Sequence, residues 1–313
     1  MKKTRVKRSK NHNSINQHQF VNFDNRYLIF SDLDGTLLNK DSQLTKYSIT
    51  VIKRLTMRGH LFCLTTARPK RNSINFYNKL NLSTPLVNYN GSWIHIPNND
   101  NFKPINFCIG VDVLYKIFTN KKILSLIDNV IFETYNGTFL LKSNKKSIPL
   151  KQLKKTLSKF NVYTTKKINF VQKDFSNLKF GAWSVLISLF DEKNANLVMN
   201  LVRDITHCVY IRQWSVKKIG SILEINSAFT NKALAMQYIA DYYGIPYSRC
   251  YCFGDSENDK QILKFVENSY AVKNAEPIAK QAAKNIIKWT NNQDAVAKTL
   301  NNIFKLGIKY KNS

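Results

Sequence analysis

The sequence YLIFSDLDGTLL at residues 27–38 decides the fold class of this 313-residue chain. Its first four residues, 27–30, form a short continuous apolar run. Such a run is typical of a strand in a parallel sheet whose two faces are both covered by helices. The run ends abruptly in the acidic sequence DLDGT at residues 32–36, which places polar side chains at the carboxyl end of the predicted strand.

A helix and a second strand follow this first strand. Apolar residues recur at helical spacing between residues 47 and 55, Gly59 predicts the end of the helix, and residues 61–64 form a second buried run. The order strand, helix, strand predicts a parallel βαβ unit.

The C-terminal region shows the same order. Apolar residues lie on one helix face between residues 234 and 242, and Gly244 with Pro246 predicts the helix end. Residues 250–253 then form a buried run, and residues 270–272 a shorter one. We therefore expect an α/β protein with a Rossmann-like, doubly wound parallel sheet as its core.

The middle of the chain has a different pattern. Residues 131–135 and 138–141 flank Asn136-Gly137, a turn dipeptide that tolerates positive φ, and this predicts an antiparallel hairpin. Further strands are predicted at 183–190, 209–214 and 221–225, with helices near 111–119, 150–159 and 193–204. This alternation predicts a separate α+β lid inserted into the parallel core.

These patterns divide the chain into three parts. Residues 1–23 are basic and almost without large apolar side chains, so they predict a flexible tail. Residues 24–92 and 221–313 form the predicted core, and residues 93–220 form the predicted inserted lid.

The composition narrows the class of protein. The hydrophobic content of 43% suffices for a buried core, and no apolar run is long enough to span a membrane. The first residues do not resemble a secretory signal, because polar residues follow the basic ones. Five cysteines without a CxxC pair indicate reduced core thiols in a cytoplasmic protein.

The charge leaves the kind of partner open. The chain has 48 Lys and Arg against 20 Asp and Glu, a net charge of +28. This charge would attract nucleic acid, an anionic membrane surface or phosphorylated small molecules. Abundant Lys, Asn and Ile also reflect an AT-rich genome. Binding of nucleic acid or an anionic surface through the tail is an alternative function.

Acidic residues follow two of the predicted strands. Asp32 and Asp34 follow the first strand, and Asp255 and Asp259 follow the strand at 250–253. In a doubly wound sheet, ligands bind outside the carboxyl ends of the strands, so these four acids are predicted to converge. Four carboxylates predict a Mg²⁺ site with Asp32, Asp34, Asp255 and Asp259 as its ligands.

Three motifs carry a resemblance to a known family. DLDGTLL from Asp32 resembles the first motif of the haloacid dehalogenase-like hydrolases, and LTTARP at 64–69 resembles the second motif of their Cof-type branch, with Ala67 in place of the usual Gly. GDSEND at 254–259 resembles the motif GDxxND. The resemblance implies that Asp32 is the nucleophile and that Asp34 is the general acid and base.

Other residues receive roles from the same resemblance. Lys232, after Glu224-Ile225-Asn226, would neutralise charge between nucleophile and phosphate, and Thr66 would bind the transferring phosphoryl group. Four further residues would support or line the phosphate site: Asn90, Gly91, Asn258 and Asn274. Asn90, Gly91 and Asn274 are equally typical of ordinary turns.

The sequence thus predicts a Mg²⁺-dependent phosphatase that acts on a small phosphorylated metabolite through an aspartyl-phosphate intermediate. Sugar phosphates, phosphorylated vitamins and nucleotides are the substrates that the resemblance implies. The lid at 93–220 would select among them. A phosphotransferase or phosphomutase with the same site is an alternative. The scattered histidines predict no zinc site.

Overall fold

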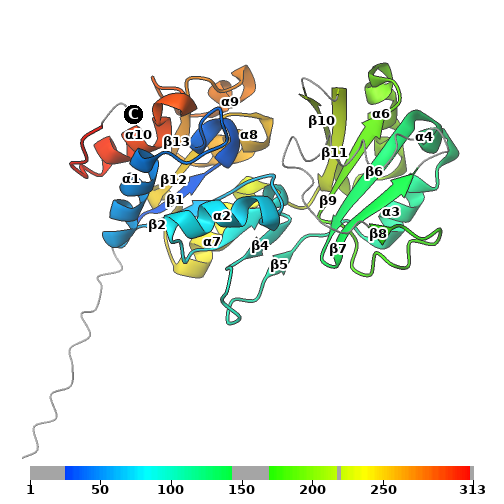
Figure 1. Cartoon of the computed structure of the whole chain (residues 1–313), viewed down its shortest axis with the longest axis horizontal. Helices are drawn as coiled ribbons and strands as arrows, with labels where there is room; N and C mark the ends of the chain where they lie inside the picture. Colours follow the sequence, from blue (N-terminus) through cyan, green and yellow to red (C-terminus); the bar gives the residue numbers. More distant parts are fainter. Residues whose placement is uncertain (1–24, 143–168, 217–219, 311–313) are drawn as a thin grey trace, which may run out of the picture.

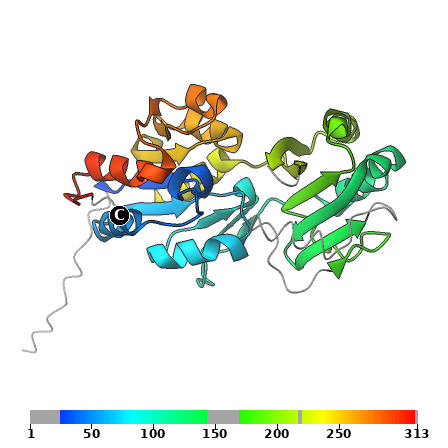
Figure 2. The same ribbon diagram turned by 45° about the horizontal axis from the view of Figure 1, so that its top comes forward.

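The chain folds into two bodies, each with its own sheet and its own apolar core (Figure 1). The computed structural model describes residues 25–142, 169–216 and 220–310. The predicted tail at 1–23 and the predicted helix at 150–159 lie outside the described residues. Viewed from a second direction, the two bodies still lie side by side (Figure 2).

The first body contains a five-stranded sheet in which all neighbouring strands are parallel. Its order is β14 (Asn285–Ile286), β13 (Asn268–Ala271), β12 (Cys250–Gly254), β1 (Leu28–Ser31) and β2 (Leu61–Leu64). The chain moves outward from β1 to β2 in one direction and from β12 to β13 in the other. The boundary between β1 and β12 is therefore the topological switch point, where ligands bind in such sheets.

Helices bury the two faces of this sheet. One group packs together around α1 and the other around α8. The first group is α1 (Lys46–Met57), α2 (Lys70–Leu80) and α10 (Ala295–Ile303), and the second is α7 (Lys232–Tyr243), α8 (Lys260–Phe265) and α9 (Pro277–Ala282). Their apolar faces share one core with strand β1, which is fully buried, and with β12, which is buried except for the half-buried Tyr251. The predicted doubly wound α/β fold is confirmed.

A small antiparallel sheet extends the first body toward the second. It consists of β3 (Leu86–Asn88), β4 (Trp93–His95) and β5 (Ile105–Asn106), with the turn η3 (Tyr89–Gly91) between β3 and β4. A parallel bridge between Thr65 and Val87 joins this sheet to the end of β2.

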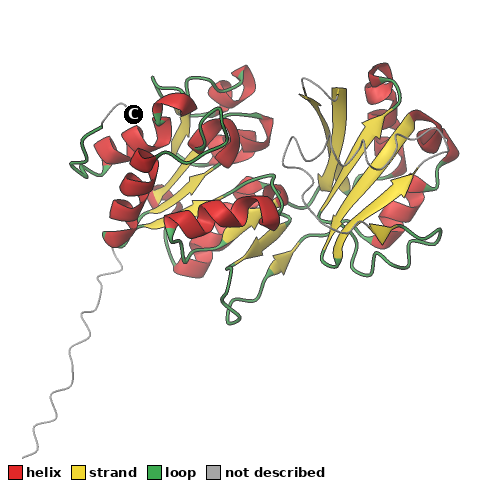
Figure 3. Ribbon diagram, viewed as in Figure 1, coloured by secondary structure: helices red, strands yellow, loops and turns green. Residues whose placement is uncertain are grey.

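The second body is a six-stranded sheet covered by helices on one face (Figure 3). Its strand order is β10 (Val209–Val216), β11 (Gly220–Ser227), β9 (Ser184–Leu189), β6 (Ile127–Thr134), β7 (Gly137–Lys142) and β8 (Asn169–Phe170). The covering helices are α3 (Val111–Phe118), α4 (Lys121–Leu126) and α6 (Ala195–Ile205). The hairpin predicted at Asn136-Gly137 is present between β6 and β7.

The strands of the second sheet have one apolar face and one face that mixes polar residues with apolar ones such as Leu186 and Ile222. On β11, Leu223 and Ile225 belong to the core beneath the helices, whereas Glu224 and Asn226 are buried polar residues on the opposite face. Side chains alternate between the faces of a strand, so this pattern directs a polar surface away from the helices. That surface faces the first body.

The packing of β4 and β11 indicates that the inserted lid does not begin at residue 93 or end at residue 220. Ile94 of β4 packs in the core of the first body, and β11 pairs within the second sheet. We therefore propose that the insert runs from Cys108 to Ser227.

Two general expectations can be compared with the structure. Among the described helices, none has both the length and the apolar composition that a membrane crossing requires. All five cysteines are free, and Cys63, Cys250 and Cys252 are buried. Cys208 is exposed, so the expectation that every thiol lies in the core was wrong for this residue.

Candidate active site

A cavity of about 640 Å³ lies between the carboxyl ends of the parallel strands and the polar face of the second sheet. Asp32, Asp34 and Thr66 line it from the first body. The second body contributes residues from four strands: Glu133, Ser184, Leu186, Arg212, Gln213, Trp214 and Glu224. Both bodies are therefore needed to form this cavity.

Lys232 holds two carboxylates together at one side of the cavity. It is the first residue of α7, whose N-terminus is capped by the side chain of Asn231. The fully buried Nζ of Lys232 donates hydrogen bonds to Oδ1 of Asp32 and Oδ1 of Asp259, each at 2.6 Å. Burial alone lowers the pKa of Lys232, but the Asp259 and Asp32 carboxylates outweigh it and raise the pKa above its ordinary value. The side chain is therefore a cation.

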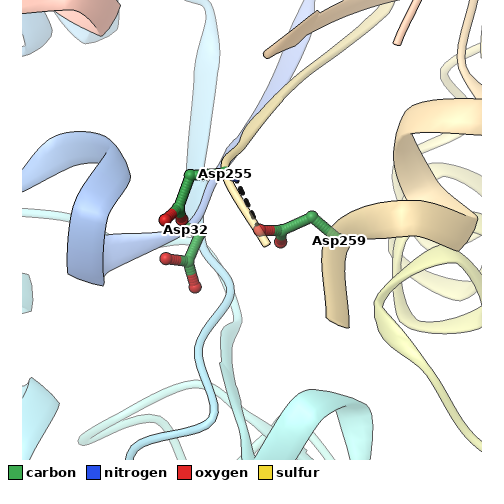
Figure 4. Close-up of side chains that lie close together, drawn as sticks. All are labelled: Asp32, Asp255 and Asp259. Atoms are coloured by element: carbon green, nitrogen blue, oxygen red, sulfur yellow. Dashed lines mark hydrogen bonds between the residues drawn. The ribbon is translucent and has the colours of Figure 1, made fainter. Parts of the chain in front are cut away.

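Three carboxylates meet at the switch point (Figure 4). One oxygen each of Asp32, Asp255 and Asp259 lies within 4.8 Å of the others. Burial raises the pKa of Asp32 to about 7 even though Lys232 opposes the shift. Burial, with the charges of Asp32 and Asp259, raises the pKa of Asp255 to about 8. The crowded negative charge is costly, and a divalent cation would offset that cost.

The hydrogen bonds show which carboxylates remain available to a cation. Asp259 uses Oδ1 for Lys232, and its Oδ2 accepts from the backbone N–H groups of Asp255 and Ser256 at 2.9 and 3.2 Å. Within the described residues, Asp32 and Asp255 each keep one oxygen without a hydrogen-bond donor. All-oxygen ligands fit a hard cation such as Mg²⁺. Asp259 holds Lys232 and the loop in position.

The backbone after Asp32 is shaped to receive Asp255. Residues Leu33–Leu37 form a single irregular turn, η2, in which Gly35 has a φ of +75°. A Cβ on Gly35 would lie 2.2 Å from Oδ2 of Asp255, so only glycine fits. The Thr36 hydroxyl donates to Oδ1 of Asp255 at 2.8 Å and fixes its orientation.

Asp34 has a different partner from the other acids. Its half-exposed carboxylate accepts from Nε of Arg68 at 2.6 Å and from Nη2 of the same guanidinium. Arg68 is itself held by the Asn72 carbonyl at 3.2 Å and by the ring of Phe76. The side chain of Asp34 is thus turned toward Arg68, and it is not one of the three clustered acids.

The remaining predicted residues lie at different distances from the cavity. Thr66 and Asn258 line it. Asn90 accepts from Asn258 at 2.9 Å and donates toward Glu224 and Asn226 of β11, so it connects the two bodies. Three of these positions thus have a direct geometric link to the cavity.

Gly91 and Asn274 have structural roles in this geometry. A Cβ on Gly91 would lie 2.7 Å from the Asn231 carbonyl, so glycine permits η3 to approach α7. Asn274 donates to the Gly35 carbonyl at 2.8 Å and therefore supports η2 from outside the cavity.

The chain matches a known family along most of its length. A family model described as haloacid dehalogenase-like hydrolase matches residues 29–300. The chain belongs to the haloacid dehalogenase-like hydrolases. The predicted family is confirmed, and the chain is an enzyme of the phosphoric monoester hydrolase class.

Two relatives and one solved structure illustrate the similarity. A 5-amino-6-(5-phospho-D-ribitylamino)uracil phosphatase of Bacillus subtilis is 32% identical over 283 residues, 90% of this chain and 98% of the relative. A second phosphatase of that name from the same bacterium is 25% identical over 280 residues, 85% and 94%. The crystal structure of a haloacid dehalogenase-like hydrolase from Bacteroides thetaiotaomicron has a TM-score of 0.70 at 21% identity and covers 89% of this chain and 100% of its own.

In this hydrolase, the second body takes part in two partly buried ion pairs that the sequence patterns did not reveal. Arg212 donates through Nε and Nη2 to Glu224 at 2.9 and 2.6 Å. Arg71 of α2 binds both oxygens of Glu133 on β6 at 2.8 and 2.5 Å and so connects the two bodies. Alternation on the strands could have indicated the direction of Glu133 and Glu224, but not their partners.

Proposed function

We propose that this phosphatase is Mg²⁺-dependent and hydrolyses a small phosphorylated metabolite through an aspartyl phosphate on Asp32. The observation that carries the proposal is the contact of Asp32 with buried Lys232, next to Asp255 and at the wall of the cavity between the two bodies. The buried cation keeps a carboxylate ready as nucleophile, because it opposes the protonation that burial favours.

The chain's own residues support a two-step reaction. A free oxygen of Asp32 attacks phosphorus, the bond from phosphorus to the leaving oxygen breaks, and Asp34 gives that oxygen a proton. Water then attacks phosphorus, Asp34 takes a proton from the water, and the bond from phosphorus to Asp32 breaks. Inorganic phosphate and the dephosphorylated alcohol leave.

The charge on the phosphoryl group requires preorganised cations. Lys232 supplies one from the protein, and the hydroxyl of Thr66 is a donor at the cavity wall. Asp32 and Asp255 would hold Mg²⁺, with Asp259 beside them. When bound, the ion neutralises negative charge on the phosphoryl oxygens and orients the group for in-line attack.

The relatives suggest the first substrate to test. Two are named for 5-amino-6-(5-phospho-D-ribitylamino)uracil, and the more similar one matches over nearly its whole length. We propose this compound as the leading candidate, ahead of sugar and vitamin phosphates. We also propose that the enzyme acts in the reducing cytoplasm, which its five free cysteines support.

Phosphate release from p-nitrophenyl phosphate and the candidate substrates, with and without Mg²⁺, tests the proposal. We expect Mg²⁺-dependent hydrolysis by the wild type and a loss of at least about a thousandfold in Asp32→Asn, because the amide is no nucleophile. Acid quenching should trap phosphate on the wild-type protein only. Full activity of Asp32→Asn would show that Asp32 is not the nucleophile.

A further inference from the structure

The charges around the cavity indicate which phosphate esters it accepts. Resting on the proposed function, we propose that the cavity selects monophosphates whose remaining part is uncharged and rich in hydroxyl or carbonyl groups. Monophosphates that carry a second anionic group on that part would be rejected. Glu224, Arg212 and Trp214 would be the residues of the second body that determine this specificity.

Among residues 25–142, 169–216 and 220–310, no cation that lines the cavity is left without an acidic partner. The lining contains two cationic side chains, Arg68 and Arg212. Arg68 is paired with Asp34, and Arg212 is paired with Glu224. Lys232, behind the lining, is buried between Asp32 and Asp259. The phosphoryl group would have Lys232 and Mg²⁺ as partners. In the described part of the lining, the leaving group would meet cations that are already paired with carboxylates.

The rim of the cavity adds uncompensated negative charge. Glu257 and Glu276 belong to the lining, and neither forms an ion pair with a lysine or arginine of the described residues. The Glu257 carboxylate accepts from the Tyr210 hydroxyl at 2.9 Å, which fixes it at the junction of the two bodies. The described lining of the cavity is thus acidic, although the chain carries a net charge of +28.

A neutral polar group would find suitable partners on the same wall. The indole N–H of Trp214 is buried and has no acceptor among the described residues, and Trp214 lines the cavity. This nitrogen has no exposed surface, so a hydroxyl or carbonyl oxygen of the bound remainder would satisfy it after a shift of the indole toward the cavity. Oε2 of Glu224 is used by Arg212, but Oε1 accepts only long hydrogen bonds, from Ser184 at 3.3 Å and Asn90 at 3.4 Å. A hydroxyl or N–H group of the ligand could therefore also donate to Oε1 without any change in net charge.

Two ligands that differ in one group provide the test. D-sorbitol 6-phosphate and 6-phospho-D-gluconate have the same acyclic chain, but the first ends in a hydroxymethyl group and the second in a carboxylate. Their inhibition constants are measured against p-nitrophenyl phosphate hydrolysis by the full chain with Mg²⁺, and their dissociation constants by calorimetry. We expect at least about tenfold tighter binding of D-sorbitol 6-phosphate, since like charges in a partly buried site repel strongly. Equal binding, or tighter binding of the gluconate, would overturn the proposal.

Variants connect this ratio to the named residues. Glu224→Gln frees Arg212, so the ratio should fall to about threefold or less. If that variant does not fold, the double variant Glu257→Gln, Glu276→Gln at the rim should lower the ratio in the same direction. Glu267→Gln removes an exposed carboxylate outside the lining and should leave the ratio unchanged. Trp214→Phe should weaken binding of D-sorbitol 6-phosphate about threefold or more through the lost donor.

The measurements distinguish a failure of the proposed function from a failure of the inference about the substrate class. Without Asp32-dependent hydrolysis of p-nitrophenyl phosphate, the proposed function fails, and calorimetry still gives the binding ratio. With hydrolysis intact and a ratio near one in wild type, only the inference about the substrate class fails.

Discussion

Replacing Lys232 with Met should damage both the stability and the activity of the enzyme. Methionine nearly preserves the length of the side chain but removes two charge-assisted hydrogen bonds, to Asp32 and Asp259. Asp259 is fully buried, so water cannot take the place of the ammonium group there, and Asp32 is exposed only toward the cavity. Removing one partner of a buried ion pair costs about 3–5 kcal/mol. That cost is a large part of the about 5–15 kcal/mol that stabilises a typical domain.

The loss in activity has a separate estimate. Lys232 is a preorganised positive charge beside the nucleophile, and removing one such group costs about 10²–10³ in kcat. Urea unfolding followed by circular dichroism measures the stability without Mg²⁺, and phosphate release at saturating Mg²⁺ measures kcat. Lys260→Met, at the exposed start of α8, is a matched control that should change stability by about 0.5 kcal/mol or less.

A double-mutant cycle separates the ion pair from general damage. Asp259→Asn in the Lys232→Met background removes one of the carboxylates left unpaired, so the two effects should be non-additive by about 1–3 kcal/mol. The reasoning is refuted if Lys232→Met loses less than about 1 kcal/mol and keeps kcat within about threefold of wild type.

Three further changes test other parts of the structure. Arg68→Ala should lower kcat about tenfold with little change in KM, because Asp34 loses the two donors that orient it. Unchanged steady-state kinetics would contradict this role of Arg68. Gly35→Ala should weaken Mg²⁺ activation at least about tenfold, because the new Cβ displaces Asp255, and a Mg²⁺ titration of the rate measures it. Burial, with the charge of Lys70, lowers the pKa of His95 to about 3. Below pH 6.5 the unfolded state therefore binds more protons than the folded state, and the free energy of unfolding falls. Between pH 7 and pH 5, wild type should lose about 2 kcal/mol more stability than His95→Gln, as measured by urea unfolding. Equal losses in the two proteins would exclude His95 as the cause.

The parallel core could be predicted because its determinants are local. The continuous apolar run at 27–30 and the acids directly after it are read along one stretch of chain. The switch point then places Asp32 beside Asp255, although 223 positions separate them, because both follow adjacent parallel strands. The order of the parallel strands thus brings two acidic sequences, distant along the chain, into one site.

The partners of the charged residues could not be predicted in this way. Arg68 pairs with Asp34 across two loops, and Arg212 faces Glu224 because β10 and β11 pair in one register. Arg71 meets Glu133 only when the two bodies pack against each other. Such pairs depend on register and on the arrangement of the two bodies, which spacing along the sequence does not contain.

The two sheets contribute to the cavity under different structural constraints. On the parallel sheet, moving Asp32 or Asp255 away from a strand end would separate the nucleophile from the cation site. The second sheet has no such constraint, since alternate residues such as Leu223 and Ile225 maintain its core while Glu224 faces the cavity. A cavity-facing residue can therefore change without loss of the core beneath it. Differences in substrate among related phosphatases should therefore concentrate on the cavity-facing positions of β6, β9, β10 and β11.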